Sequence, residues 1–168
     1  MRAFLARRRV ALGFVFGALV LYLAQPTLPS LVAGATVALV GQGIRLWAAG
    51  HLEKSREVTV SGPYQFMRHP LYVGSSIMAL GVAVGSQSWW VAMLVTAYMG
   101  LTLTAAIRSE EAFLRQRFGT AYDDYAESRG PRVERRFSWE RAWRNKEYRA
   151  LAGLAIFLGL LTLRMTLR

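Results

Sequence analysis

Residues 62–74, GPYQFMRHPLYVG, gather side chains that could bind a charged ligand. The chemically capable residues of this stretch are Tyr64, Arg68, His69 and Tyr72. A proline favours extended backbone in the residue before it and suits the first position of a helix. The sequence therefore predicts a helix that starts at about Pro70. The free amides and positive dipole end of such a helix favour an anionic group.

Two adjacent carboxylates, Glu110 and Glu111, form a second chemically capable feature. Arg115 follows Glu111 by one helical turn, a spacing typical of an ion pair on a solvated helix face. Four residues after Glu110 the chain has Leu114. Neighbouring residues point about 100° apart around a helix. We therefore expect Glu110 to contact a ligand and Glu111 to hold the helix through Arg115.

Several other residues that could belong to a site also have a simpler structural interpretation. Gly74 leaves room for a ligand or for a neighbouring helix. Arg45 lies inside an apolar block, where snorkelling to the membrane surface suffices. His51 is predicted to be interfacial, and the acids at 123–124 to be exposed rather than metal ligands. The chain has no cysteine, which excludes disulfides, thiolate zinc sites and a cysteine nucleophile.

The chain is too apolar for an average soluble domain, with 54% hydrophobic residues among 168. Its apolar residues fall in five blocks at about 10–24, 31–50, 71–85, 89–107 and 150–163. A membrane-spanning helix needs about 20 residues, so the second and fourth blocks suffice alone and the others need their flanks. We predict an all-α integral membrane protein with one domain over residues 1–168. Its helices would form two hairpins followed by a C-terminal helix.

The basic residues are distributed very unevenly. Of the 21 Arg and Lys residues, 18 lie in segments 1–9, 51–70 and 108–149. Positive charge accumulates on the cytoplasmic side of membrane proteins. We therefore predict a cytoplasmic N-terminus and cytoplasmic catalytic segments at 51–70 and 108–149. This explains the net charge of +11 without nucleic acid.

Smaller patterns predict how the helices pack. Two small-xxx-small pairs, Gly13 with Gly17 and Gly81 with Gly85, are typical of close helix contacts. Residues 108–128 continue the fourth helix as an amphipathic segment that breaks at Gly119. The basic segment after it, with two tryptophans, is predicted to lie along lipid headgroups.

The stretch 62–74 resembles the Gly-x-Tyr…Arg-His-Pro-x-Tyr-x-Gly signature of integral-membrane methyltransferases. These are the isoprenylcysteine carboxyl methyltransferase and phospholipid methyltransferase relatives. Glu110-Glu111, Phe118-Gly119 and Tyr122…Tyr125 are similar to the C-terminal pattern of that family. Arg45-Leu-Trp-Ala looks like its bacterial members. The resemblance covers roughly residues 40–128.

The resemblance implies S-adenosylmethionine as cofactor, bound on the cytoplasmic side of a bacterial inner membrane and without a metal. The residues carried over to the cofactor pocket are Tyr64, Arg68, His69, Pro70, Tyr72, Gly74, Glu110 and Glu111. Candidates for catalysis are Arg68, His69 and Glu110, and candidates for contact with the methyl acceptor are Arg45, Tyr122 and Tyr125. Methyl transfer needs mainly alignment and exclusion of water. The acceptor is expected to be a lipid-like or other apolar small molecule that is accessible from the membrane, and to undergo O- or N-methylation. Membrane lipids are the expected partners.

Two other functions are compatible with the sequence. A membrane reductase of the sterol type would use NADPH within a similar helical bundle. A small packing or transport subunit would have no catalytic site, and alanine would be tolerated at Arg68, His69 and Glu110. The non-enzymatic alternative leaves the cluster of residues at 62–74 unexplained.

Overall fold

The computed structural model describes residues 2–127, 129 and 133–167, with side chains in the first helix from residue 13 onward. In this part of the chain every regular element is a helix, which confirms the all-α prediction. The elements are α1 (Arg2–Leu23), α2 (Leu28–Ala49), the 3-10 helix η1 (Gly62–Gln65), α3 (Pro70–Ser86), α4 (Trp89–Phe118), α5 (Thr120–Ala126), α6 (Trp139–Arg144) and α7 (Glu147–Thr166).

Each predicted apolar block lies in a helix. Among the residues whose placement the structure describes, three helices, α2, α4 and α7, are long and apolar enough to cross a membrane. The part of α1 whose side chains are described, Gly13–Leu23, and the whole of α3 are shorter apolar helices. The last helix is longer than its apolar block, because Glu147–Arg149 and Arg164–Thr166 extend it at both ends. That all five helices cross the membrane stays a prediction.

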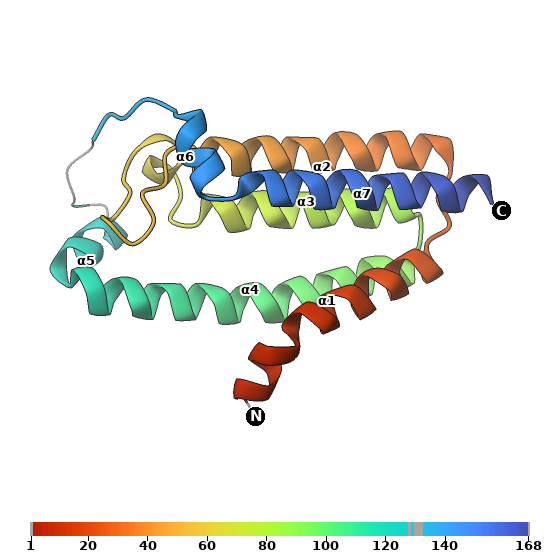
Figure 1. Ribbon diagram of the computed structural model, residues 1–168, viewed down its shortest axis with the longest axis horizontal. Helices are drawn as coiled ribbons and strands as arrows, with labels where there is room; N and C mark the ends of the chain where they lie inside the picture. The colour runs from red at the N-terminus through yellow and green to blue at the C-terminus, as the bar shows by residue number, and fades with distance from the viewer. Residues whose placement is uncertain (1, 128, 130–132, 168) are drawn as a thin grey trace.

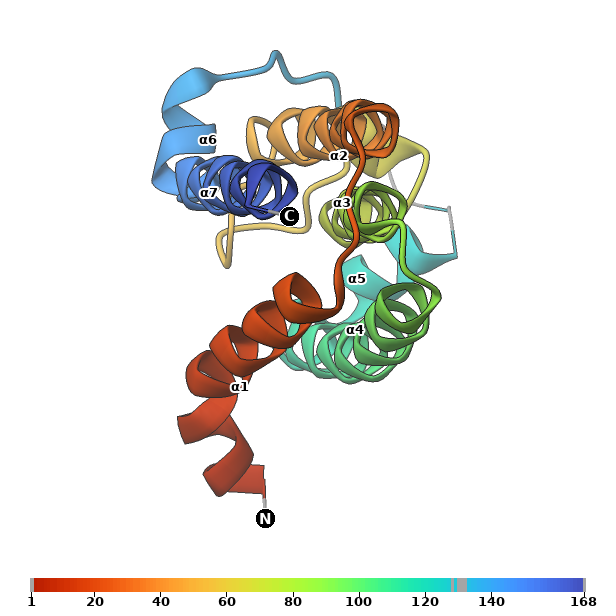
Figure 2. The same cartoon turned by 90° about the vertical axis from the view of Figure 1, so that its right-hand side faces the viewer.

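The helices run roughly along one axis, and the polar connections gather at one end (Figure 1). Helices α2, α3 and α7 lie side by side, and α4 runs along α3 on the side away from α2 (Figure 2). The 3-10 helix, α5 and α6 lie together at the left of Figure 1, whereas the α1–α2 and α3–α4 turns lie at the right. Segments 51–70 and 108–149, which the charges assign to one side of the membrane, therefore meet at one end of the bundle.

Glycines bring α2 and α3 into direct backbone contact. A β-carbon on Gly34 would lie 2.5 Å from the backbone of Gly85, and one on Gly81 would lie 2.5 Å from the amide nitrogen of Ala38. Any side chain there would force the two helices apart, so the predicted packing role of the second glycine pair is confirmed. The same prediction for Gly13 and Gly17 is wrong in the described structure, because β-carbons there would meet no atom within 4 Å.

The turns at the far end are tied together by hydrogen bonds. The backbone N–H of Gln25 donates to the carbonyl of Ser86 over 2.7 Å, and the Thr27 hydroxyl donates to the Gln87 side chain over 2.8 Å. Thr27 also forms a capping box with Ser30 at the start of α2. Such a box satisfies two otherwise free amides, which explains why α2 begins at Leu28, before the predicted block.

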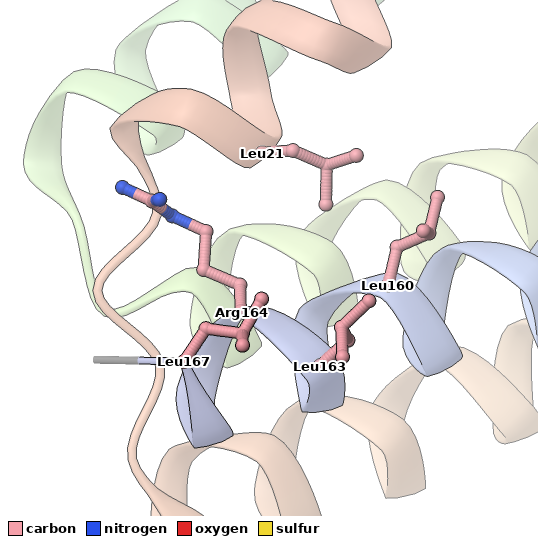
Figure 3. Close-up of a pocket in the computed structure, with 5 residues that line it drawn as sticks. All are labelled: Leu21, Leu160, Leu163, Arg164 and Leu167. Atoms are coloured by element: carbon pink, nitrogen blue, oxygen red, sulfur yellow. The ribbon is translucent and has the colours of Figure 1, made fainter.

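Arg164 of α7 closes the same end of the bundle. Its guanidinium donates to the carbonyl oxygens of Tyr22 (2.6 Å) and Ala24 (3.2 Å), at the end of α1. A cation there satisfies carbonyls that have no partner within the helix. Leucines of α7 lie opposite Leu21 around an apolar cavity of about 270 Å³ (Figure 3). Arg164 therefore fastens α1 to α7.

Candidate functional site

The turn at Gly62 directs the chain toward the polar end of α3. Gly62 has φ +58°, a conformation that favours glycine. A β-carbon there would also lie 2.6 Å from the ring of His51. Pro63 lies in the first turn of η1, and the following Tyr64 is buried. A side chain at position 62 would therefore displace both the turn and Tyr64.

The third apolar helix begins at Pro70, as predicted. His69 precedes it with non-helical backbone (φ −129°, ψ 59°). Its imidazole does not cap the helix among the residues described here; Nε2 instead lies 3.2 Å from Oε1 of Glu111 on α4. The first turn of α3 and the extension of α4 are thus joined by side chains 42 positions apart in the sequence.

A cavity of about 560 Å³ lies beside the start of α3. Segment 52–59, η1, residues 106–114 of α4, and α5 enclose it. Most of the predicted site residues line it, namely Tyr64, Arg68, His69, Pro70, Tyr72, Glu110, Tyr122 and Tyr125. This volume is typical of pockets for small molecules and cofactors.

Three predicted site residues, Glu111, Gly74 and Arg45, lie outside the cavity lining. Glu111 contacts the side chains of His69 and Arg68, which do line the cavity. Gly74 faces α2, where a β-carbon would lie 2.7 Å from the carbonyl oxygen of Gly41. Of the two roles that the sequence left open for Gly74, the structure shows the contact with a neighbouring helix.

Glu111 joins three basic side chains. Its carboxylate lies 3.2 Å from Nε2 of His69, 3.5 Å from Arg115 and 3.7 Å from Arg68. The contact with Arg115 is the predicted one, and the other two come from the chain before α3. Because both arginines are about half exposed, water screens their contacts with the carboxylate. The contact with the largely buried His69 therefore contributes most to the position of Glu111.

Glu110 has a different environment. It borders the cavity and makes no ion pair in the part of the chain that the structure describes. Tyr64 and Tyr72 are its close polar neighbours. A carboxylate in that position favours a cation or a group that donates hydrogen bonds. As expected, Glu111 pairs with basic side chains of the fold, whereas Glu110 borders the cavity.

Three tyrosines, one from η1 and two from α5, form a wall of the cavity. The Tyr125 hydroxyl donates to the carbonyl oxygen of Tyr64 over 2.9 Å. The rings of Tyr122 and Tyr125 lie 6.2 Å apart. Burial raises the pKa of Tyr64 and of Tyr122, and raises the pKa of Tyr125 to about 12. All three phenols therefore stay neutral at physiological pH and can donate hydrogen bonds.

Arg45 does not snorkel and does not line the cavity. It forms a two-point ion pair with Glu147 of α7, with Nε to Oε1 at 2.8 Å and Nη2 to Oε2 at 3.0 Å. Gln42 donates to the same carboxylate over 3.1 Å. The remaining nitrogen, Nη1, donates to the Leu71 carbonyl and the Ser75 hydroxyl. Arg45 therefore connects α7 to the first turns of α3, beside the cavity.

His51 is buried rather than interfacial, with 4% of its surface exposed. Its Nδ1 lies 2.9 Å from the carbonyl oxygen of Trp47, and its Nε2 lies 3.1 Å from that of Arg135. The sequence prediction was wrong because the segment at 133–138 folds back over the end of α2. His51 thus fastens that segment to the bundle.

No residue of 52–59 was singled out as a site residue, although segment 51–70 was predicted to be a cytoplasmic catalytic segment. Segment 52–59 forms one wall of the cavity, although it has no regular structure. Glu147 was also missed, although a lone acid at the edge of an apolar block is a signal for a buried partner. Its partner is 102 positions away, so local spacing could not identify it.

A family model described as phospholipid methyltransferase matches residues 14–121. The match covers more than half of the chain. The chain belongs to the phospholipid methyltransferase family. The matched range includes residues 62–74 and both glutamates, but ends before Tyr122. This confirms the resemblance seen in the sequence and indicates a membrane methyltransferase.

Curated relatives carry two kinds of name. The nickel-cobalt-cadmium resistance protein NccN of Alcaligenes xylosoxydans xylosoxydans is 38% identical over 55% of this chain and 43% of its own length. The probable protein-S-isoprenylcysteine O-methyltransferase of Oryza sativa subsp. indica is 35% identical over 46% of this chain and 40% of its own. That of Schizosaccharomyces pombe is 31% identical over 51% and 36%. The chain thus spans about two fifths of the length of these relatives. No solved structure matches it.

Proposed function

We propose that this membrane methyltransferase transfers a methyl group from S-adenosylmethionine to a lipid-like acceptor by O- or N-methylation. The reaction would take place at the cytoplasmic face of a bacterial inner membrane. The observation that carries the proposal is the cavity beside α3, which brings Arg68, His69 and Glu110 together with a tyrosine wall. The family and the relatives named as methyltransferases support the same reaction.

The residues around the cavity fit the polar groups of this cofactor. Arg68 and the first turn of α3 suit its carboxylate. Glu110 suits its ammonium group or its ribose hydroxyls. Tyrosine faces attract a sulfonium cation with about 0.5–2 kcal/mol. Tyr64 and Tyr72 both line the cavity near Glu110, so cation-binding groups cluster on that side.

When bound, S-adenosylmethionine would supply an electrophilic methyl group that needs no metal. The chain's residues would hold the acceptor in line with that group and keep water away, which can lower a barrier by several kcal/mol. His69 is the candidate for proton transfer. If its Nε2–H donates to Glu111, as their 3.2 Å separation allows, Nδ1 can accept the proton that the acceptor releases.

The acceptor would reach the cavity from the lipid. Ala106 and Phe113 line the cavity, and both belong to α4, a helix apolar and long enough to cross a membrane. Phe113 is 46% exposed. An apolar wall that continues onto a membrane helix suits an acceptor with a hydrocarbon chain.

Membranes that contain the protein test this function directly. With methyl-labelled S-adenosylmethionine, label should enter the lipid extract, and Arg68→Ala should reduce the incorporation at least 10-fold. A parallel binding experiment with S-adenosylhomocysteine and NADPH separates the reductase alternative. Binding of NADPH alone would overturn the proposal, and full incorporation of label by the alanine variant would place the site elsewhere.

A further inference from the structure

The hydroxyl of Tyr122 is a buried polar group with nothing to bind. Only 1% of the surface of this residue is exposed. Among the described residues, its oxygen has no hydrogen-bond partner. A buried hydroxyl without a partner is unfavourable and is rare in folded proteins. Tyr122 lines the cavity beside α3, so a bound molecule is the natural source of the missing partner.

The hydroxyl of the neighbouring Tyr125 has a partner among the described residues, unlike that of Tyr122. The Tyr125 hydroxyl is used within the fold, since it donates to the backbone of Tyr64 over 2.9 Å. The two phenols belong to the same short helix, α5, and their rings lie 6.2 Å apart. One hydroxyl thus stabilises the wall, while the other is left for the cavity.

The charges around Tyr122 define the ligand group that would suit it. Two arginines and two carboxylates are near its hydroxyl, namely Arg68, Arg115, Glu110 and Glu111. The guanidinium of Arg115 lies 5.5 Å from the centre of the Tyr122 ring. Glu111 is paired with His69, Arg68 and Arg115 and does not line the cavity, and Glu110 has Tyr72 as a hydrogen-bond partner. Arg68 does line the cavity, so it is the cation that an anionic ligand group would meet there. A neutral phenol beside cations donates best to an anion.

We propose that the Tyr122 hydroxyl donates a hydrogen bond to the carboxylate of the cofactor's amino-acid group, next to Arg68. This inference rests on the proposed function. It makes Tyr122 a residue for binding the cofactor rather than the methyl acceptor. It also predicts that the amino-acid end of the cofactor lies toward α5 and the reacting methyl group lies away from it.

The test compares two ligands and two variants by calorimetry. S-adenosylhomocysteine carries the amino-acid group, and 5′-methylthioadenosine lacks it. Tyr122→Phe should weaken binding of the first by about 10-fold or more, as for a hydrogen bond to a charged group. It should leave binding of the second unchanged. Without ligand, its melting temperature should be equal to or above that of the wild type, because only an oxygen without a partner is removed.

Tyr125→Phe is the matched control. It removes a satisfied hydroxyl, so it should lower the melting temperature without ligand and should not distinguish between the two ligands. Equal weakening of both ligands by Tyr122→Phe, no weakening of either, or a clear loss of stability without ligand would each overturn the inference. If the folded wild type binds neither compound, the proposed function itself fails, and this inference fails with it.

Discussion

Replacing Glu110 with glutamine should weaken cofactor binding and leave stability nearly unchanged. Glu110 borders the cavity, and it makes no ion pair within residues 2–127, 129 and 133–167. A charge-assisted hydrogen bond to a ligand is worth roughly 1.5–3 kcal/mol, or about 10- to 150-fold in affinity. No internal ion pair is lost, and the glutamine oxygen can still accept the hydrogen bond from Tyr72. The melting temperature should therefore shift by no more than about 1–2 °C.

Glu111→Gln should give the opposite pattern. Its contacts with Arg68 and Arg115 are partly solvated, because these arginines are 51% and 50% exposed. Each is therefore worth at most about 1 kcal/mol. The contact with His69, which is 16% exposed, is better shielded. A total loss of about 1–2 kcal/mol would lower the melting temperature by about 2–8 °C for a chain of this size. Affinity should fall less than in Glu110→Gln.

The assay combines calorimetric titration with S-adenosylhomocysteine and thermal unfolding in detergent. Glu140→Gln serves as control, because Glu140 is 86% exposed and lies 3.9 Å from its partner Arg144. It should change neither quantity. A greater loss of affinity in Glu111→Gln than in Glu110→Gln would refute the assignment of roles. Unchanged affinity in both variants would show that the pair is an ordinary solvated face.

Two further predictions concern the frame around the site. Glu147→Gln should destabilise the protein by roughly 3–5 kcal/mol, because it leaves Arg45 charged and partly buried; a loss below about 1 kcal/mol in thermal or denaturant unfolding would contradict the structural role of this pair. Reporter fusions should place Gln87 outside the cytoplasm and Arg129 inside it, and a cytoplasmic Gln87 would overturn the predicted topology.

Much of the fold follows from local sequence properties. The apolar blocks predicted the helices because burial of every backbone polar group in lipid requires a helix over that length. Pro70 fixed the start of α3, and Gly119 ended α4 as expected, with φ +53°. The spacing of Gly81 and Gly85 predicted their contact with α2. Gly13 and Gly17 have the same spacing without such a contact, because spacing alone does not determine which helix approaches.

The site could be predicted only where its residues lie close together in the sequence. The chemical types in 62–74 and at Glu110 were sufficient to identify one side of the cavity, with Tyr64, Arg68, His69, Pro70, Tyr72 and Glu110. The pair Arg45–Glu147 and the burial of His51 could not be predicted, because both depend on segments about 80–100 positions away that fold back onto α2. The free hydroxyl of Tyr122 could not be predicted either, since it depends on what the surrounding residues fail to supply.

The central claim is that the cavity beside α3 binds S-adenosylmethionine. The most direct test is a calorimetric titration of the purified, folded protein with S-adenosylhomocysteine, repeated with Arg68→Ala. The account predicts saturable binding to one site in the wild type and affinity at least 10-fold weaker in the variant. Absence of binding to the folded wild type, or equal affinity in both proteins, would contradict it.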